Sequence, residues 1–418
     1  MKPIRSICLG LIILLGCLMS SQNVTAESEF TAPRLEVHGF VSQGFLKSWE
    51  NNVFAGTEDG TFQFNEFGVN VMAELIEQLH AGVQIFSRDL GDIGNNDVIL
   101  DWAYGDYRWR DWLGVRAGKI KIPYGLYNET RDIDMLRTSI FLPSSIYYEG
   151  NRERQNTLIG AGVYGDISAA ALGTFTYQLQ IGDANMSSES GDMKYAQDQN
   201  SALATMEIER QYTADLEWET PLEGLRLGGF VMQTDLSIEL SDTTSSDETT
   251  SDAASSDAST TASDTSTESE NPPSSDSSSR FVPDETQRFY IVSAEYGWNN
   301  VILSGEYQIA PDSHAPEGYY LGASYRLNDH FEFGGYYSVY YGRASDKDGK
   351  HREEQGMADY SAWQKEWVAS VRVDLNTSWT IKAEGHLING TAQMLTQDNP
   401  DDMKEDSYLF ALKTSYLF

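Results

Sequence analysis

Apolar and polar residues alternate at a period of two along much of this chain, and no other feature constrains its fold as strongly. In "FTYQLQIG" one face carries Phe175, Tyr177, Leu179 and Ile181, and the other carries Thr176, Gln178 and Gln180. Such a period is typical of β-strands with one apolar and one polar face. The final segment, "YLFALKTSYLF", alternates to the last residue, Phe418. Because terminal residues usually fray, this segment is predicted to pair with another strand in a closed sheet.

The N-terminus predicts export from the cytoplasm. Two basic residues precede the apolar run "ICLGLIILLGCLM", and Val24 and Ala26 form the small-residue pair of a cleavage site. Residues 1–26 are therefore expected to be a cleaved signal peptide. A lipoprotein signal is the alternative, because "LLGC" places a glycine before Cys17. The other cysteine, Cys8, also lies in this segment, so the mature chain is expected to contain no disulfide.

An exported chain without helical spans is either a soluble protein or an outer-membrane barrel, and the composition favours the barrel. No later apolar run approaches the ~20 residues of a membrane helix. Aromatic residues make up 12% of the chain, while polar residues on alternate positions keep the mean hydropathy at -0.42. The formal net charge of -34 argues against nucleic acid as a partner, since phosphate backbones attract clustered Lys and Arg.

The connections between alternating runs are short on one side and long on the other. Tight turns such as "PLEG", "WNN" and "LND" contrast with long polar stretches such as "GRASDKDGKHREEQGMADYSA". This asymmetry is typical of outer-membrane barrels, which have short periplasmic turns and longer outer loops. The runs predict an all-β transmembrane antiparallel barrel of about sixteen strands over residues 27–418. The final strand is expected to close on the first, near "RLEVHGFVSQGF".

Residues 241–279 are rich in Ser, Thr and Asp and contain no aromatic or large aliphatic residue. Such a composition predicts a disordered extracellular loop, because it cannot bury enough surface to offset the entropy of ordering. A shield or tether is one reading of this segment, and a tolerated insertion at a loop tip is the favoured one.

The connection at residues 124–155, "YGLYNETRDIDMLRTSIFLPSSIYYEGNRERQ", combines apolar and charged residues. A loop with its own apolar residues is expected to bury them rather than to extend into solvent. We expect it to fold into the lumen after the fifth strand and to place charges opposite the wall, as pores do when they select ions. The predicted constriction residues are Glu129, Arg131, Asp132, Asp134, Arg137, Arg152 and Arg154.

The run from Leu113 to Arg154 resembles the corresponding strand and loop of Gram-negative outer-membrane porins, in particular those related to phosphate-selective and general diffusion porins. The matching positions are Arg116, Gly118, Lys119, Lys121, Pro123, Gly125, Asn128, Arg131, Asp132 and Arg137. The resemblance covers about a tenth of the chain. It implies that the loop after the fifth strand is a constriction, that ions and small hydrophilic solutes pass the lumen, and that three barrels associate as a homotrimer.

Further expectations concern the wall and the chain's end. The predicted lumen-wall residues are Lys119, Lys121, Glu207, Glu209, Asp215, Glu217, Glu306, Arg326 and Arg372. Acids outnumber bases on the predicted wall and favour cations, although cross-strand pairing that cancels these charges is nearly as well supported. Tyr416 and Phe418 resemble the C-terminal signal that the barrel-assembly machinery reads. The expected surroundings are outer-membrane lipid and lipopolysaccharide.

The sequence offers little support for chemistry. No H-x-x-H spacing or G-x-S-x-G motif occurs, and the acidic loops lack the spacing of a defined Ca²⁺ loop. We therefore predict no catalytic residue, no metal, no cofactor and no enzymatic activity. Two rivals to a passive pore remain: a plugged barrel that acts as a surface binding or adhesion protein, and a barrel enzyme with an outer-rim His such as His351. A TonB-type transporter is disfavoured by the chain's length.

Overall fold

Sixteen antiparallel strands form one closed sheet in the computed structural model, as the alternation predicts. The structure describes residues 33–54, 56–91, 93–184, 190–199, 203–240 and 280–418. The chain divides into two units, Met1–Arg34 and Leu35–Phe418, and the second contains the barrel. The predicted signal peptide, both cysteines and the segment 241–279 lie outside the described residues.

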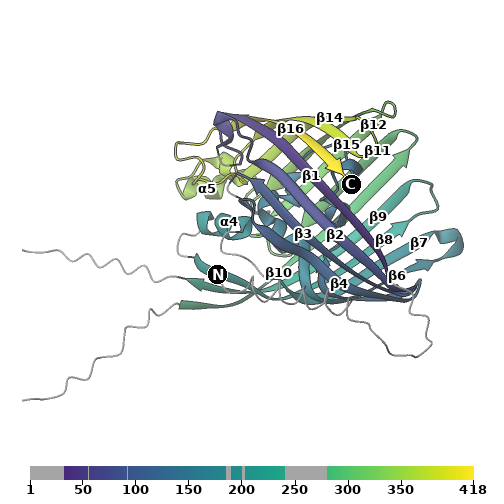
Figure 1. The fold of residues 1–418 in the computed structure, drawn as a ribbon. Coiled ribbons are helices and arrows are strands. Elements are labelled where there is room, and N and C mark those ends of the chain that lie inside the picture. Colours follow the sequence, from purple (N-terminus) through teal and green to yellow (C-terminus); the bar gives the residue numbers. More distant parts are fainter. Residues whose placement is uncertain (1–32, 55, 92, 185–189, 200–202, 241–279) are drawn as a thin grey trace, which may run out of the picture. The chain divides into compact units, whose positions relative to one another are not determined.

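The strands follow one another around the barrel in sequence order (Figure 1). Their bounds are β1 (Arg34–Trp49), β2 (Phe64–Ile76), β3 (Leu79–Leu90), β4 (Val98–Arg110), β5 (Leu113–Lys121), β6 (Thr157–Ser168), β7 (Thr174–Ala184), β8 (Leu203–Glu219), β9 (Leu225–Leu240), β10 (Arg280–Trp298), β11 (Val301–Ile309), β12 (Glu317–Arg326), β13 (Phe331–Tyr341), β14 (Trp363–Asp374), β15 (Trp379–Asn389) and β16 (Asp406–Leu417).

The barrel closes where β16 pairs with β1. The register runs from Phe40 opposite Leu417 to Trp49 opposite Tyr408. Beyond it, Gly39 and Phe418 exchange two backbone hydrogen bonds of 2.8 and 2.9 Å. Figure 1 shows yellow β16 beside purple β1. The predicted pairing of the last strand with the first is therefore confirmed, and it leaves neither strand with a free edge along this register.

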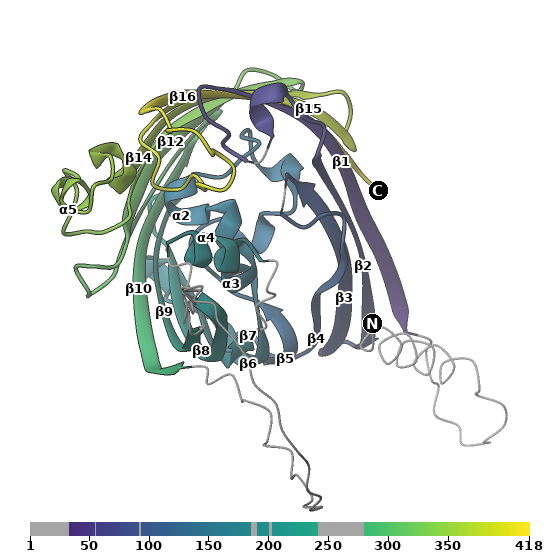
Figure 2. The ribbon, with the colours of Figure 1, turned by 90° about the vertical axis from the view of Figure 1, so that its left-hand side faces the viewer.

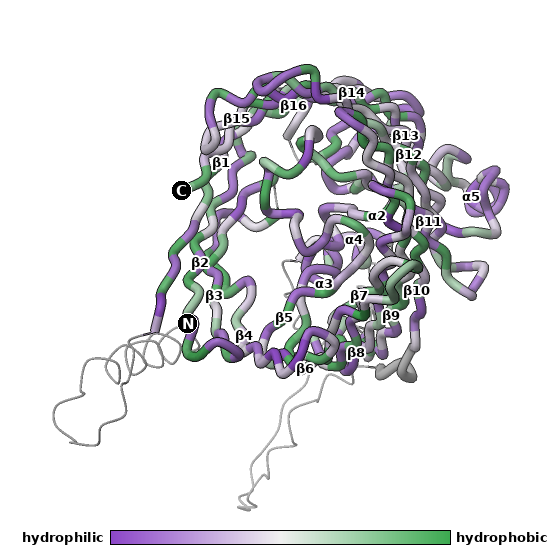
Figure 3. The backbone as a smooth tube through the Cα atoms, turned by 90° about the vertical axis from the view of Figure 1, so that its right-hand side faces the viewer, coloured by the Kyte–Doolittle hydropathy of each residue, from purple (hydrophilic) through white to green (hydrophobic). Residues whose placement is uncertain are grey.

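The two faces of each strand meet different surroundings, as β16 illustrates. Leu409, Ala411 and Lys413 are buried inside the barrel, whereas Phe410 and Leu412 are exposed on its outer surface. Coloured by hydropathy, the strands mix purple and green along their length (Figure 3). A closed sheet with an apolar outer face can meet lipid without leaving backbone groups unpaired.

The connections alternate in length as expected. Short turns cover residues 77–78, 111–112, 169–173, 220–224, 299–300, 327–330 and 375–378. The longer connections contain the helices η1 (Thr57–Asp59), η2 (Asn128–Thr130), η3 (Asp134–Leu136), α2 (Ser144–Tyr147), η4 (Glu149–Asn151), α3 (Arg152–Asn156), α4 (Gly191–Gln199), α5 (Lys350–Glu354) and η6 (Asp359–Ala362), while η5 (Ala170–Leu172) lies in a short turn. Among the described residues, no helix combines the length and the apolar character needed to cross a membrane.

Candidate pore constriction

Residues 122–156, which we call the inner loop, connect β5 to β6 and lie inside the ring of strands. Figure 2 shows α2 and α3 of this loop surrounded by the wall. In the loop, Tyr124, Leu142, Ile146 and Tyr147 are buried in one apolar cluster. The cluster also contains Phe230, Met232, Phe289, Ile291 and Tyr320 of the lumen wall. The inward fold is thus driven by burial of apolar surface on both partners.

A second apolar contact lies farther along the inner loop. The ring of Phe141 stacks against Phe64 of β2 at a centroid distance of 5.3 Å and against Phe54 at 5.4 Å. Phe54 belongs to the connection between β1 and β2. Because these rings come from separate parts of the chain, their stacking ties the loop to the β1–β2 side of the barrel.

Carboxylates of the wall accept hydrogen bonds from the inner loop. Glu384 of β15 accepts the backbone N–H groups of Ile140 at 2.7 Å and Phe141 at 3.0 Å. Glu306 of β11 accepts the Leu126 N–H at 2.9 Å and the Tyr147 hydroxyl at 2.5 Å. Glu295, Glu332 and Glu366 accept loop hydroxyls from Tyr127, Thr138 and Ser144. These wall acids therefore satisfy buried donors of the loop.

Basic residues of β14, β15 and β16 also bond the inner loop. Lys382 donates to the carbonyl oxygens of Asp134 at 2.6 Å and Ser139 at 2.9 Å, and Arg372 donates to that of Met135. Lys413 lies 2.8 Å from the Asp134 carboxylate. Together the acids and bases hold the loop at several points around the lumen.

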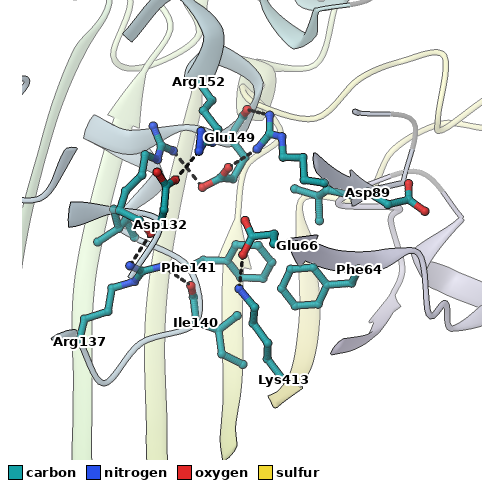
Figure 4. A pocket seen from close by; sticks show the side chains of 14 residues that line it. Phe64, Glu66, Asp89, Asp132, Arg137, Ile140, Phe141, Glu149, Arg152 and Lys413 are labelled. Carbon is teal, nitrogen blue, oxygen red and sulfur yellow. Dashed lines mark hydrogen bonds and ion pairs between the residues drawn. The ribbon is translucent and has the colours of Figure 1, made fainter. Parts of the chain in front are cut away.

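Three acids of the inner loop each pair with more than one base, and Figure 4 shows two of these acids, Glu149 and Asp132. Glu149 pairs with Arg88 of β3 at 2.7 Å and with Arg131 at 2.9 Å. Asp132 pairs with Lys121 at 2.6 Å and with Arg152. Asp134 pairs with Arg137 at 3.2 Å as well as with Lys413. The loop is consequently cross-linked by charge to β3, β5 and β16.

These pairs shift the protonation of the loop acids. Burial by itself raises the pKa of Glu149, but Arg131 and Arg88 outweigh it and lower that pKa to about 2. The pKa values of Asp132 and Asp134 are likewise lowered, since Arg152 and Lys121 for the first, and Lys413 and Lys382 for the second, outweigh the effect of burial. All three acids are therefore charged at neutral pH.

Three of the cavities along the inner loop form a series in which neighbouring cavities share lining residues. The largest, about 520 Å³, is lined by the long β3–β4 connection, Lys119, Arg88 and Arg152. Arg88 and Arg152 also line a narrow cavity of about 20 Å³ between the loop, β2, β3 and β16. Arg137 and Leu142 line this narrow cavity and a third, of about 110 Å³, near the short turns. The series extends from the side of the long connections to the side of the short turns.

The structure places the predicted constriction residues inside the barrel, but most do not face open space. Arg131, Asp132, Asp134 and Arg152 are each at most 7% exposed. Glu129 accepts a hydrogen bond of 3.2 Å from Gln178 of β7. The sequence predicts these charges opposite the wall and does not specify their partners. In the structure most of them pair with the wall or with each other, because an unpaired charge in this crowded space would carry a large desolvation cost.

Seven of the predicted wall residues lie on the lumen side. Lys119 lines the largest cavity, Lys121 and Arg372 bond the inner loop, and Glu306 supports it. Asp215 lies opposite Phe230 in the β8–β9 register, and both residues are buried. Glu217 pairs with Arg226 at 3.3 Å, and Arg326 pairs with Glu332 at 2.8 Å and with Asp374 at 2.5 Å.

The placement of Glu207 and Glu209 differs from the prediction. The β8–β9 register shifts between Ile208 and Arg210, so Glu209 is the extra residue of a bulge. The shift turns Ile208 into the barrel, where it packs with Ala184 and Leu236. Glu207 consequently lies on the outer face, and both glutamates are exposed. The bulge inverts the faces of the preceding residues.

Sequence reasoning missed Arg88, Glu66 and the helix α4. Arg88 shares a face of β3 with Gln84 and Phe86, at alternate positions, and this pattern in "VQIFSRDL" could have indicated it. Glu66 pairs with Lys413 at 2.5 Å across the narrow cavity (Figure 4). No group of three or more His, Cys, Asp or Glu residues that could hold a metal ion occurs within the part of the chain that the structure describes.

The fold and its inner loop define a porin-like barrel, and solved structures share that fold. The outer-membrane channel DcaP of Acinetobacter baumannii has a TM-score of 0.56 at 9% identity, covering 95% of this chain and 100% of its own. The anion-selective porin from Comamonas acidovorans has a TM-score of 0.54 at 11% identity, over 92% and 100%. Salmonella typhi OmpF, solved with daunomycin, has a TM-score of 0.54 at 11% identity, over 93% and 98%.

At these identities the likeness is one of fold, and the expected porin architecture is confirmed at that level. No protein-family model matches the chain, and no curated protein matches it significantly.

Proposed function

We propose that the protein is an outer-membrane porin through which ions and small hydrophilic solutes diffuse passively, without a cofactor or a catalytic step. The observation that carries this proposal is the series of three cavities that share Arg88 and Arg152 at one junction and Arg137 and Leu142 at the other. They run beside the inner loop from the long connections to the short turns. A solute that crosses the barrel by this route passes the narrow cavity, which therefore sets the size limit.

The charges at the narrow cavity support a weakly selective pore. Its lining includes five bases, Arg88, Arg131, Arg137, Arg152 and Lys413, and four acids, Glu66, Asp89, Asp132 and Glu149. The bases exceed the acids by one, so the lining has a net excess of one positive charge. The ion pairs described above cancel most of the electric field of these groups. The small net charge supports the alternative in which paired charges of the lumen cancel each other, and it does not support a strong preference for cations.

Location and assembly follow from the same proposal. The exposed apolar outer face suits contact with outer-membrane lipid and lipopolysaccharide. Tyr416 and Phe418 are proposed to serve as the signal for the barrel-assembly machinery, after export and removal of residues 1–26. A homotrimer remains a prediction, and the mass of the detergent-extracted protein, measured with bound detergent subtracted, tests it.

Single-channel current across a planar bilayer under a KCl gradient tests the pore. Arg137 lines two of the cavities, so Arg137→Glu is expected to move the reversal potential toward cation selectivity. Arg137→Lys, which keeps the charge, is the matched control. An identical reversal potential for both variants would remove Arg137 from the conducting path. Steady ohmic openings of the unmodified protein are expected.

A plugged barrel that acts as a surface binding or adhesion protein is the second candidate. The inner loop favours it, because it bonds the wall from β10 to β16 and stacks against β2. This candidate predicts a protein that inserts into the bilayer and carries no current.

A further inference from the structure

The helix α4 lies at the end of the barrel that also carries α5, and it packs on η4 and α3 of the inner loop (Figures 1 and 2). A side chain on Gly191 would lie 2.5 Å from the carbonyl oxygen of Gly150, so the two backbones approach too closely for any larger residue. Tyr195 meets Tyr148 edge to face at 6.2 Å and donates a hydrogen bond of 2.9 Å to the carbonyl of Ala392. The helix therefore joins the inner loop to the connection between β15 and β16.

Asp192 in the first turn of α4 is buried at this junction with poor compensation for its charge. It is 4% exposed. Its Oδ1 lies 3.3 Å from Nε of Arg154, and its Oδ2 accepts the backbone N–H of Arg154 at 3.3 Å. Asp132, by contrast, has close contacts with two different bases, Lys121 and Arg152. A carboxylate with a single neighbouring cation is costly to bury in its charged form.

The other charged groups around Asp192 do not remove this cost. Glu153, next to Arg154 in α3, raises the pKa of Asp192, and Arg88 of β3, which is paired with Glu149, lowers this pKa by less than Arg154 does. On the helix itself, Asp198 bonds Thr396 instead. Burial is the largest influence, and it raises the pKa of Asp192 from an ordinary 3.8 to about 6 despite the Arg154 charge.

We propose that α4 is a pH-responsive lid, held against the inner loop while Asp192 is protonated and released from the inner loop as Asp192 ionises. The inference rests on the proposed channel function and adds a regulation to it. Since the docked carboxyl binds its proton more tightly than the free one, docking is favoured at low pH. This advantage is complete below the ordinary pKa of 3.8 and is lost as the pH rises through about 6.

The size of the effect follows from these two pKa values. Between about pH 7.5 and about pH 5, the ratio of docked to released α4 is expected to rise about tenfold. A docked α4 covers the end of the barrel next to α3, so the channel is expected to spend more time in a low-conductance state at acidic pH.

Single-channel recording of the full chain at about pH 5 and about pH 7.5 tests the lid. The unmodified protein is expected to show the tenfold change in the ratio of low- to high-conductance dwell times. Asp192→Asn imitates the protonated acid and should remain in the low-conductance state at both pH values. Asp312→Asn, at an exposed position in the connection between β11 and β12, should keep the pH dependence.

Hydrogen exchange of the backbone amides in residues 191–199, corrected for the intrinsic effect of pH, gives a second readout that needs no current. Protection of α4 should be about tenfold higher at the acidic pH and lose its pH dependence in Asp192→Asn. A conducting channel whose dwell times do not change with pH overturns the lid and leaves the channel standing. A pH dependence of the dwell times that survives in Asp192→Asn also overturns the lid and leaves the channel standing. Absence of current at both pH values overturns the proposed function instead, and exchange then still decides whether Asp192 controls docking.

Discussion

The pairing of Glu149 with Arg88 and Arg131 predicts how firmly the inner loop is held. Glu149→Gln keeps the shape of the side chain and removes its charge, which leaves two buried arginines without their shared partner. The pKa of Glu149 falls from an ordinary 4.5 to about 2. That difference corresponds to about 3 kcal/mol of stabilisation of the ionised, docked loop.

Hydrogen exchange of the amides in residues 122–156, followed by mass spectrometry in detergent, measures this loss. The loop of Glu149→Gln is expected to open about a hundredfold more often, whereas amides in β10 to β16 should exchange as before. Glu153→Gln is the matched control, since it removes the same charge from the same segment and Glu153 forms none of the ion pairs found among the described residues. Equal exchange in the two variants would show that the ion pairs do not hold the loop.

The same pair predicts a pH dependence with a definite sign. Because the pKa of docked Glu149 lies below its ordinary value, the stabilisation is present above about pH 4.5 and is lost as the pH falls toward about 2. Loop exchange in the unmodified protein should therefore accelerate over that interval, and in Glu149→Gln it should not. An unmodified loop that keeps its protection down to about pH 2 would contradict the assignment.

Three further predictions concern the inner loop, the closure of the barrel between β1 and β16, and the bulge at Glu209. Phe141→Ala removes the ring that stacks against both Phe54 and Phe64 and is expected to destabilise the docked loop by about 3–5 kcal/mol, seen as faster loop exchange. Gly39→Val should prevent closure at Phe418, because a Cβ at position 39 lies 2.8 Å from a backbone oxygen of β2; loss of the heat-modifiable band on a gel measures this. A thiol-reactive cation should change the current through Glu217→Cys and leave that through Glu207→Cys unchanged, and equal block of both would contradict the bulge.

The barrel could be predicted from the sequence because its pattern is local. A strand that meets lipid on one side and water or protein on the other must alternate, whatever its neighbours are. The final strand shows this, since the alternation of Tyr408 to Phe418 predicts both its exposed face and its need for a partner. The length and apolar content of residues 124–155 likewise predict that the loop folds inward.

The partners of each charged side chain could not be predicted in the same way. Glu306 and Glu384 alternate like lumen residues, yet each accepts loop backbone N–H groups instead of facing water. Arg88 belongs to the narrow cavity only because β3 and the inner loop meet there. Such contacts join residues far apart in the chain, so no local pattern records them.

The sequence by itself determined the number of strands, the closure of the barrel and the segment that enters it, because hydrophobic alternation and connection length depend on neighbouring residues alone. Only the tertiary structure decided which charged side chains are paired. One extra residue at Glu209 reverses the face of Glu207, and the free energy of a buried charge depends on partners such as Arg88 and Arg131 that packing brings to Glu149.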